Sequence, residues 1–285
     1  MRTTHNPLRT KAAPYKFEPI VFLVVTHIPC EEAVGYHSER FEVVKMCLET
    51  MRRGAHRDHT FMVWDNDSNS TFRDWLQHIF EPDILVMSKN IGKNPARAAA
   101  INSIPLGSIV CYSDDDMFYY DNWLKPQLEL LYHFPGVSVV TGNPVRTQAR
   151  WGIANTLKWA RENGKVKQGR FIPNEWEQDF CVSIGRDYED YHIPNTIKDI
   201  DYRVTYENKQ AYVMSHHCQF IGYAVKLLPA LAYYNDGMAM SDEKPFDEAL
   251  DREGLRLCTI DRHTRHIGNV MDDRIRKAYD ETFSE

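Results

Sequence analysis

Short apolar runs alternate with helical segments over the first 115 residues or so of the chain. The apolar runs are predicted to be strands, because β-branched and aromatic residues between Gly, Pro and Asn favour that state. These strands cover residues 20–25, 61–64, 84–87 and 109–112. Helices are predicted between them, at residues 41–51, 71–80 and 96–102. This order predicts an α/β fold with a mostly parallel sheet flanked by helices.

Polar side chains follow each predicted strand at the point where it ends. Thr26 and His27 follow the first strand, Asp65 the second, Asn90 the third, and 114–116 the fourth. The carboxyl ends of parallel strands meet at one edge of a sheet, where α/β proteins bind their ligands. We therefore expect these residues to share one site.

The pattern becomes less regular after residue 145. Residues 146–236 mix aromatic and charged side chains with isolated Gly and Pro and show no clean periodicity. An irregular second lobe is predicted there, with a boundary at residue 145. Residues 1–17 are polar and basic and lack the apolar centre of a secretory signal, so a flexible tail is predicted.

Composition excludes several classes of protein. An apolar fraction of 43% and a charged fraction of 26% are ordinary for a globular chain, and the net charge of −6 argues against nucleic-acid binding. No apolar run is long enough to cross a bilayer. Six cysteines without a Cys-x-x-Cys pair indicate reduced thiols in a cytoplasmic protein. A zinc site combining Cys181 or Cys218 with His216 and His217 is not supported by the spacing.

Three consecutive carboxylates, Asp114, Asp115 and Asp116, form the most informative segment. Adjacent acids at the end of a buried strand repel one another unless a positive charge compensates them. A hard divalent cation with oxygen ligands does this, and such ions also bind nucleotide phosphates. A solvated acidic turn is the alternative, and the three residues alone leave both interpretations open.

Taken together, these segments resemble a GT-A glycosyltransferase, most closely the inverting family 2 enzymes that use nucleotide sugars. Residues 61–68 resemble that family's second strand and its Asp-Asn-x-Ser turn. Residues 90–102 resemble its Asn-x-Gly and Ala-x-Asn segment. Residues 114–116, followed by 121–124, resemble its DXD motif and the Trp-Leu that opens a helix.

A third matching region lies near the C-terminus. An acidic pair, Asp242 and Glu243, precedes Gly254 by about one helix, and His266 follows twelve residues after that glycine. The family usually has Glu-Asp where this chain has Asp-Glu, so the identity of the base stays open. The first strand also departs from the family, since Thr26 begins a Thr-His-Ile-Pro sequence in place of Pro-Thr-Tyr-Asn.

The resemblance implies a nucleotide-sugar-binding subdomain at 18–145 and an acceptor-binding subdomain with the catalytic base at 146–285. It implies a UDP-, GDP- or dTDP-linked sugar donor and a Mn²⁺ or Mg²⁺ ion. Asp116 is expected to bind the metal directly, Asp114 through water or by a contact to the ribose, and His266 to complete the shell. The residues expected to contact the donor are Thr26, Asp65, Asn90, Lys93, Arg97, Asp114 and Asp115.

Two of these roles have structural alternatives. Asp65 is expected to accept a hydrogen bond from the nucleobase, but an aspartate there also caps a turn readily. Glu243 occupies the family's base position, followed in preference by Asp242 and then Asp247. The acidic pair also suits the first turn of a helix.

Several functions remain open at this stage. The main expectation is transfer of a sugar to an acceptor hydroxyl with inversion of the anomeric centre. The alternatives are a retaining GT-A enzyme, a sugar-phosphate nucleotidyltransferase, and a non-catalytic module that holds Ca²⁺. The expected acceptor is a glycan or a small molecule. A cytoplasmic location is expected, and a peripheral membrane contact stays open although no basic amphipathic stretch favours it.

Overall fold

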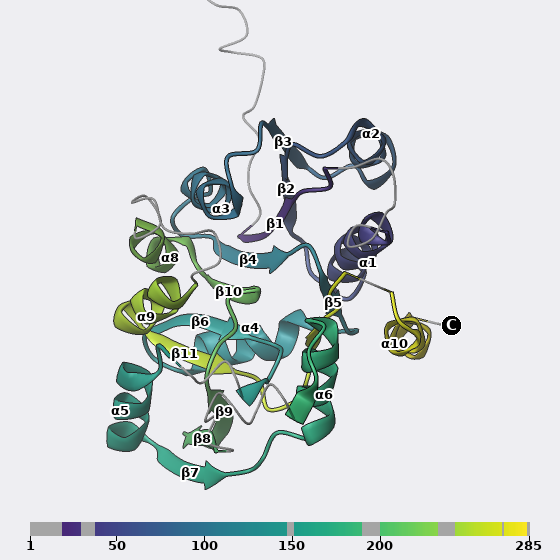
Figure 1. Cartoon of the computed structure of the whole chain (residues 1–285). Helices are drawn as coiled ribbons and strands as arrows, with labels where there is room; N and C mark the ends of the chain where they lie inside the picture. Colours follow the sequence, from purple (N-terminus) through teal and green to yellow (C-terminus); the bar gives the residue numbers. More distant parts are fainter. Residues whose placement is uncertain are drawn as a thin grey trace, which may run out of the picture.

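The computed structural model describes residues 19–29, 38–146, 151–189, 200–232, 243–269 and 271–283. The predicted tail at 1–17 and the candidate base Asp242 lie outside these residues. Figure 1 shows a central sheet with helices on both sides.

The predicted parallel sheet forms the first half of a ten-stranded mixed sheet. Its strand order is β3-β2-β1-β4-β10-β6-β11-β9-β8-β7. The four predicted strands are all present and pair in parallel, as β1 (Ile20–Thr26), β2 (Thr60–Asn66), β3 (Ile84–Ser88) and β4 (Ile109–Asp114). The carboxyl ends of these four strands therefore lie along one edge of the sheet, as the sequence predicts.

The remaining strands extend this sheet with a mixture of directions. β10 runs antiparallel to both β4 and β6, whereas β6 and β11 are parallel. They are β6 (Val137–Thr141), β7 (Lys165–Gly169), β8 (Asp201–Tyr206), β9 (Lys209–Val213), β10 (Gln219–Tyr223) and β11 (Leu255–Cys258). Because β10 lies between β4 and β6, segments on both sides of residue 145 build one sheet. The division at residue 145 stays a prediction that residues 18–145 bind the nucleotide sugar and residues 146–285 bind the acceptor.

Two helical layers cover the sheet because residues of β1 alternate between its faces. Phe22 and Val24 pack in one apolar cluster with α1 and α4, and Val21 and Leu23 pack in another with α3, α8 and α9. The helices are α1 (Arg40–Arg53), α2 (Ser70–Trp75), the π-helical turn η3 (Leu76–Phe80), α3 (Lys93–Asn102), α4 (Leu124–His133), α5 (Ala154–Asn163), α6 (Asn174–Ser183), α8 (Ala224–Leu231), α9 (Lys244–Glu253) and α10 (Asp273–Phe283).

A separate two-stranded ribbon connects the acidic segment to the C-terminal part of the chain. β5 (Met117–Tyr119) pairs antiparallel with β12 (Thr264–His266), and His266 lies opposite Met117. The backbone N–H of Ile267 also donates to the carbonyl of Asp116 at 2.7 Å. This ribbon brings His266 beside the acidic segment, although the two are far apart in sequence.

Two further expectations concern the environment of the chain. Within the described residues, no helix has the length and apolar character that crossing a membrane requires. The five cysteines in those ranges are free thiols, and all except Cys218 are buried.

Candidate functional site

The candidate site lies at the carboxyl edge of the parallel strands, where β4 ends in the acidic segment 114–116. Each of its three carboxylates faces a different basic side chain. Asp114 pairs with Lys93 of α3 at 2.7 Å, Asp115 pairs with Arg40 of α1, and Asp116 lies 3.4 Å from Nε2 of His266. The carboxylates are therefore held close together and partly compensated by the protein itself.

Asp116 and His266 form the pair most suited to a metal ion. Oδ1 of Asp116 is buried and has no hydrogen-bond partner among the described residues, although a buried carboxylate oxygen normally has one. Nδ1 of His266 lies 2.8 Å from Oγ of Ser183, which orients Nε2 towards Asp116. Metal-binding histidines are commonly oriented in this way by a contact to their second ring nitrogen. The pair thus fits a divalent cation.

The charges in this pair shift both pKa values. Burial favours the neutral acid, but His266, Arg40 and Lys93 hold the pKa of Asp116 below its ordinary value. Burial also favours a neutral imidazole, but Asp116 raises the pKa of His266. For Asp115, burial raises the pKa although Arg40 opposes the shift. Asp116 is therefore an anion that is available to a cation.

Asp114 has a different environment from Asp116. Its Oδ1 accepts a hydrogen bond from the Tyr112 hydroxyl at 2.7 Å, and its Oδ2 contacts Lys93. Burial would lower the pKa of Lys93, but Asp114 and Glu243 raise it above its ordinary value. Both oxygens of Asp114 are engaged, which suits the expected indirect role better than direct coordination of a metal.

Glu243 is the second member of a row of alternating charges that begins at Arg97 and ends at Asp114. Nη2 of Arg97 lies 2.9 Å from Oε2 of Glu243, and Nζ of Lys93 lies 3.5 Å from Oε1. Arg97 and Lys93 lie one turn apart on α3, and Glu243 directly precedes α9. The structure therefore brings four residues predicted for the site together, in the order Arg97, Glu243, Lys93 and then Asp114.

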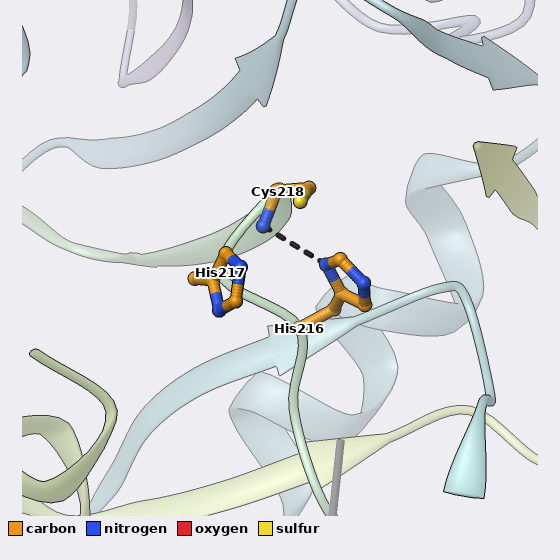
Figure 2. Close-up of side chains that lie close together, drawn as sticks. All are labelled: His216, His217 and Cys218. Atoms are coloured by element: carbon orange, nitrogen blue, oxygen red, sulfur yellow. Dashed lines mark hydrogen bonds between the residues drawn. The ribbon is translucent and has the colours of Figure 1, made fainter. Parts of the chain in front are cut away.

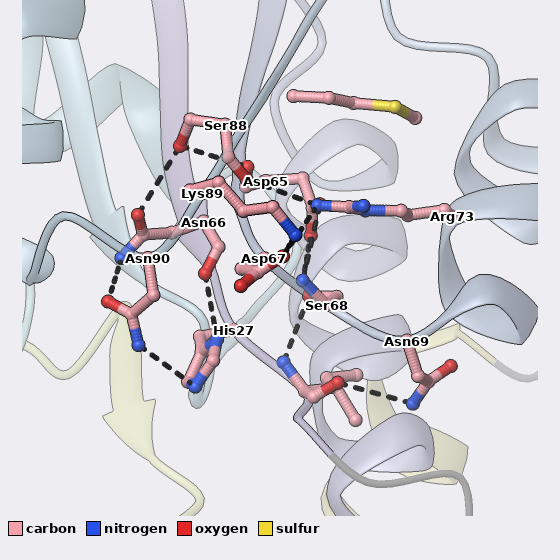
Figure 3. A network of polar contacts seen from close by, with 12 residues as sticks. His27, Asp65, Asn66, Asp67, Ser68, Asn69, Arg73, Ser88, Lys89 and Asn90 are labelled. Carbon is pink, nitrogen blue, oxygen red and sulfur yellow. Dashed lines mark hydrogen bonds and ion pairs between the residues drawn. The ribbon is translucent and has the colours of Figure 1, made fainter.

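Asp65 lies in a polar network at the end of β2, shown in Figure 3. It is fully buried, and its carboxylate contacts Nε of Arg73 at 2.6 Å and the backbone N–H of Ser68 at 3.3 Å. Thr26 is equally buried, with its hydroxyl 3.5 Å from Asp65. These contacts correspond to the turn-capping alternative for Asp65. The expected nucleobase contact remains a prediction.

Asn90 lies in the same network, nearer to solvent. Its Oδ1 accepts hydrogen bonds from Asn66 at 3.1 Å and from the backbone N–H of Gly92 at 2.9 Å. Its Nδ2 lies 3.4 Å from Nε2 of His27. Asn90 thus shapes the loop between β3 and α3 and links it to the end of β1.

A cavity of about 720 Å³ opens beside the pair formed by Asp116 and His266. Its volume is within the range that small-molecule sites occupy. It is lined by Asp116, Val182, Ser183, Ile184, Gly185, His266, Ile267, Asn269 and Asp272. The end of α6 and the segment after β12 therefore form the walls of a cavity with the acidic segment at its base.

A tight turn before β10 carries His216, His217 and Cys218, whose potential ligand atoms lie within 4.8 Å of one another (Figure 2). Nδ1 of His216 accepts a hydrogen bond from the backbone N–H of Cys218 at 3.0 Å. Nδ1 of His217 lies 3.2 Å from Oδ2 of Asp247. Nδ1 of each histidine is therefore engaged, and the sequence spacing does not support a zinc site, so we assign no metal to this cluster.

His216 is buried and neutral. Burial lowers its pKa well below the ordinary value, and the neighbouring His217, His266 and Lys93 add to the shift. A depressed folded-state pKa stabilises the fold above the unfolded pKa of about 6.5, and that stability is lost as the pH falls below it.

We expect this titration to be visible in the free energy of unfolding. Below pH 6.5, His216 should contribute a loss of roughly 1.4 kcal/mol per pH unit that is absent from His216→Gln. Urea unfolding at pH 7.5 and 5.5 measures the difference. His56→Gln, at an exposed histidine, should keep the slope of the unmodified protein. Equal slopes for that protein and His216→Gln would contradict the assignment.

Two features of the site were not predicted from the sequence. Arg40 contacts Asp115 and lies 3.8 Å from Asp116, but it is the first residue of α1 and has no neighbouring motif. His217 contacts Asp247 across 30 residues, although the sequence singled out His217 only for an unsupported zinc site and Asp247 only as the third candidate base. Both contacts depend on long-range packing, which local patterns do not report.

Comparisons with known proteins bear on the fold. No protein-family model matches the sequence, and no curated protein matches it significantly. A crystal structure of GalNAc-T7 with UDP, GalNAc and Mn²⁺ is similar over 87% of this chain, with a TM-score of 0.51 and 10% identity. The chain spans only 43% of the length of GalNAc-T7.

A second similar structure is 4-diphosphocytidyl-2C-methyl-D-erythritolsynthase from Anaerococcus prevotii DSM 20548. The match covers 91% of this chain and 93% of that one, with 11% identity, but its TM-score of 0.46 is too low to support an argument. The chain therefore has an α/β fold with a mixed sheet flanked by helices, of the kind found in GT-A glycosyltransferases.

Proposed function

We propose that this protein is a metal-dependent glycosyltransferase that moves a sugar from a nucleoside-diphosphate donor to an acceptor hydroxyl. The observation that carries the proposal is the buried Oδ1 of Asp116, which has no hydrogen-bond partner in the described ranges and lies beside the oriented imidazole of His266. These two candidate metal ligands lie at the carboxyl edge of a GT-A-like sheet and line a cavity. Family 2 membership and inversion of the anomeric centre belong to the same proposal.

The residues around Asp116 suit a diphosphate leaving group. Asp116 and His266 would hold Mn²⁺ or Mg²⁺, with Asp114 acting through water or at the ribose. When bound, the ion supplies Lewis-acid stabilisation of the charge that develops on the β-phosphate. Lys93 is a partly buried cation between Asp114 and Glu243. It adds positive charge on the side of the acidic segment opposite Arg40.

The acceptor hydroxyl must lose a proton when its oxygen attacks the anomeric carbon. Three carboxylates remain as candidate bases, namely Glu243, Asp242 and Asp247. Glu243 is already engaged by Arg97 and Lys93, and Asp247 by Arg256 and His217. The proposed function itself requires only that one base lies beside the acceptor.

The GalNAc-T7 structure was solved with UDP, GalNAc and Mn²⁺. That likeness supports a nucleotide-sugar donor and a divalent ion for this chain as part of the proposal. UDP-, GDP- and dTDP-linked sugars are the candidate donors, with a glycan or a small molecule as acceptor. The main alternatives are a retaining GT-A enzyme and a sugar-phosphate nucleotidyltransferase, and the stereochemistry of the product separates inversion from retention.

Calorimetry with UDP, GDP and dTDP, with and without Mn²⁺, tests the proposal directly. We expect one nucleotide to bind only when the metal is present, and the corresponding nucleotide sugars to be hydrolysed slowly without an acceptor. EDTA should abolish both signals, and added Mn²⁺ should restore them. If none of the nucleotides binds, the proposed function is wrong and a structural Ca²⁺ site becomes the better explanation.

A further inference from the structure

We infer that His217, oriented by Asp247, is the general base that deprotonates the acceptor hydroxyl. This inference rests on the proposed function and identifies a base that is not among the three candidate carboxylates. It depends on the contact between the two side chains, the anchoring of Asp247, and the position of the turn that carries His217.

The contact between His217 and Asp247 determines which ring nitrogen carries the proton. Nδ1 of His217 lies 3.2 Å from Oδ2 of Asp247. An ionised carboxylate can only accept hydrogen bonds, so Nδ1 is the donor and Nε2 keeps its lone pair. Nε2 makes no hydrogen bond with the described residues, and the side chain is 23% exposed. A base oriented in this way by an acidic partner is the arrangement that activates hydroxyl groups in many enzymes.

Asp247 is itself held in an ion pair with Arg256. It is buried on α9, and its Oδ1 accepts a hydrogen bond from Nη2 of Arg256 at 2.6 Å. Arg256 is fully buried and also donates to Oγ and the carbonyl of Ser215, at 2.6 and 3.0 Å. Ser215 directly precedes the turn with the two histidines. Arg256 therefore fixes both Asp247 and the segment that carries His217.

The turn lies against the acidic segment of the site. The backbone N–H of Asp114 donates to the carbonyl of Cys218 at 2.7 Å, and the next pair along the strands joins Gln219 to Ser113. His217 is therefore one residue from the chain segment that borders Asp114.

The charged and titratable neighbours of this turn come from several elements. α9 contributes Asp247 and Glu243, α3 contributes Lys93, and the end of β4 contributes Asp114. His216 is on the turn itself, and its low pKa keeps it neutral beside His217. The positive charge that forms on His217 during the reaction is therefore compensated mainly by Asp247, the carboxylate that contacts it within the described part of the chain.

The proposed step balances as follows. The acceptor oxygen forms a bond to the anomeric carbon while the bond from that carbon to the β-phosphate oxygen breaks. The electron pair of the broken bond leaves with the nucleoside diphosphate. Nε2 of His217 takes the proton of the acceptor hydroxyl, and the resulting imidazolium later releases it to solvent.

This assignment gives Glu243 a different role from the base. Its oxygens face Arg97 at 2.9 Å and Lys93 at 3.5 Å. Glu243 and Asp247 are four residues apart and lie on the same side of α9. Glu243 then positions Arg97 and Lys93 near the diphosphate, and Asp247 positions the base His217. Two acidic residues one helical turn apart thus organise the donor side and the acceptor side of the site.

Substitution of the two residues separates these roles. His217→Gln should lower kcat for transfer by about 10² to 10⁴-fold, while nucleotide binding with Mn²⁺ changes less than about threefold. Asp247→Asn should lower kcat less and shift the acid limb of its pH profile, because the altered partner no longer orients and stabilises the imidazole. Glu243→Gln should instead raise the KM for the donor and leave the shape of the pH profile unchanged.

His78→Gln, at an exposed histidine on η3, is the matched control and should behave like the unmodified protein. Circular dichroism of each variant verifies that it is folded. The inference is wrong if His217→Gln binds the nucleotide normally and transfers the sugar at the original rate with the original pH profile. Absence of nucleotide binding in the unmodified protein would instead count against the proposed function.

Discussion

Replacing Asp116 with asparagine is expected to abolish metal-dependent turnover while the protein stays folded. The substitution removes the negative charge beside His266 and the buried oxygen that has no partner among the described residues. Metal stabilisation of a leaving diphosphate contributes several kcal/mol, so a loss of about 10³-fold in kcat/KM is expected. The fold should survive, because asparagine has the same size and removes repulsion from Asp114 and Asp115.

Titration with Mn²⁺, followed by calorimetry and by sugar transfer, measures this effect. Asp121→Asn is a suitable control, since Asp121 follows the acidic segment closely but its side chain is 55% exposed and contacts His56. That variant should bind Mn²⁺ and turn over normally. Transfer at the original rate by a folded Asp116→Asn protein would show that the acidic segment does not hold the metal.

The parallel half of the sheet follows from local patterns. Each of its strands is a short apolar run, and successive residues of β1, such as Phe22 and Leu23, pack on opposite faces. A strand buried on both faces needs apolar residues throughout, so its sequence is distinctive. The polar residues after each run then define the edge at which the site forms, and this part of the prediction needed no long-range information.

The antiparallel half of the sheet could not be predicted in the same way. β10 is only five residues long and includes a glycine and a glutamine. Its place between β4 and β6 is set by long-range pairing, and a short strand carries little signal of its own. The same limit applies to the turn before β10, which supplies His217 and Cys218 to the site.

The approach of His266 to Asp116 was expected from the residue spacing of a family that the sequence resembles. The physical cause is the ribbon of β5 and β12, in which His266 pairs with Met117, the residue directly after Asp116. Neither strand is longer than three residues. No periodicity in segments this short would indicate that they pair, so the residues alone did not predict this contact.

The acidic segment also differs from the prediction that a bound cation alone compensates its three carboxylates. A cation was predicted because adjacent carboxylates need compensation, and Lys93, Arg40 and His266 already supply part of it. Only Asp116 retains a buried oxygen without a partner in the described part of the chain. The proposed metal site therefore consists of one carboxylate and one imidazole, and Asp114 and Asp115 contribute mainly to the electric field around them.

Replacing Arg256 with methionine is expected to destabilise the fold more than any other single change considered for this site. Arg256 is fully buried and donates hydrogen bonds to Asp247 at 2.6 Å and to the carbonyls of Trp151 and Gly152 at 2.9 and 2.7 Å. Methionine fills much of the same volume but leaves Asp247 as a buried anion without its main counter-charge. Breaking a buried pair in this way costs about 3–5 kcal/mol, which urea unfolding at pH 7.5 would measure.

The double variant Arg256→Met with Asp247→Asn tests whether the buried charge causes that loss. Neutralising Asp247 removes the uncompensated anion, so part of the lost stability should return although the carbonyl contacts stay broken. Arg276→Met is the control, because Arg276 is 58% exposed and only 4.0 Å from Glu39, and such surface pairs contribute at most about 1 kcal/mol. A loss below 1 kcal/mol for Arg256→Met, or no recovery in the double variant, would mean that Arg256 does not anchor Asp247. The orientation of His217 would then need another cause.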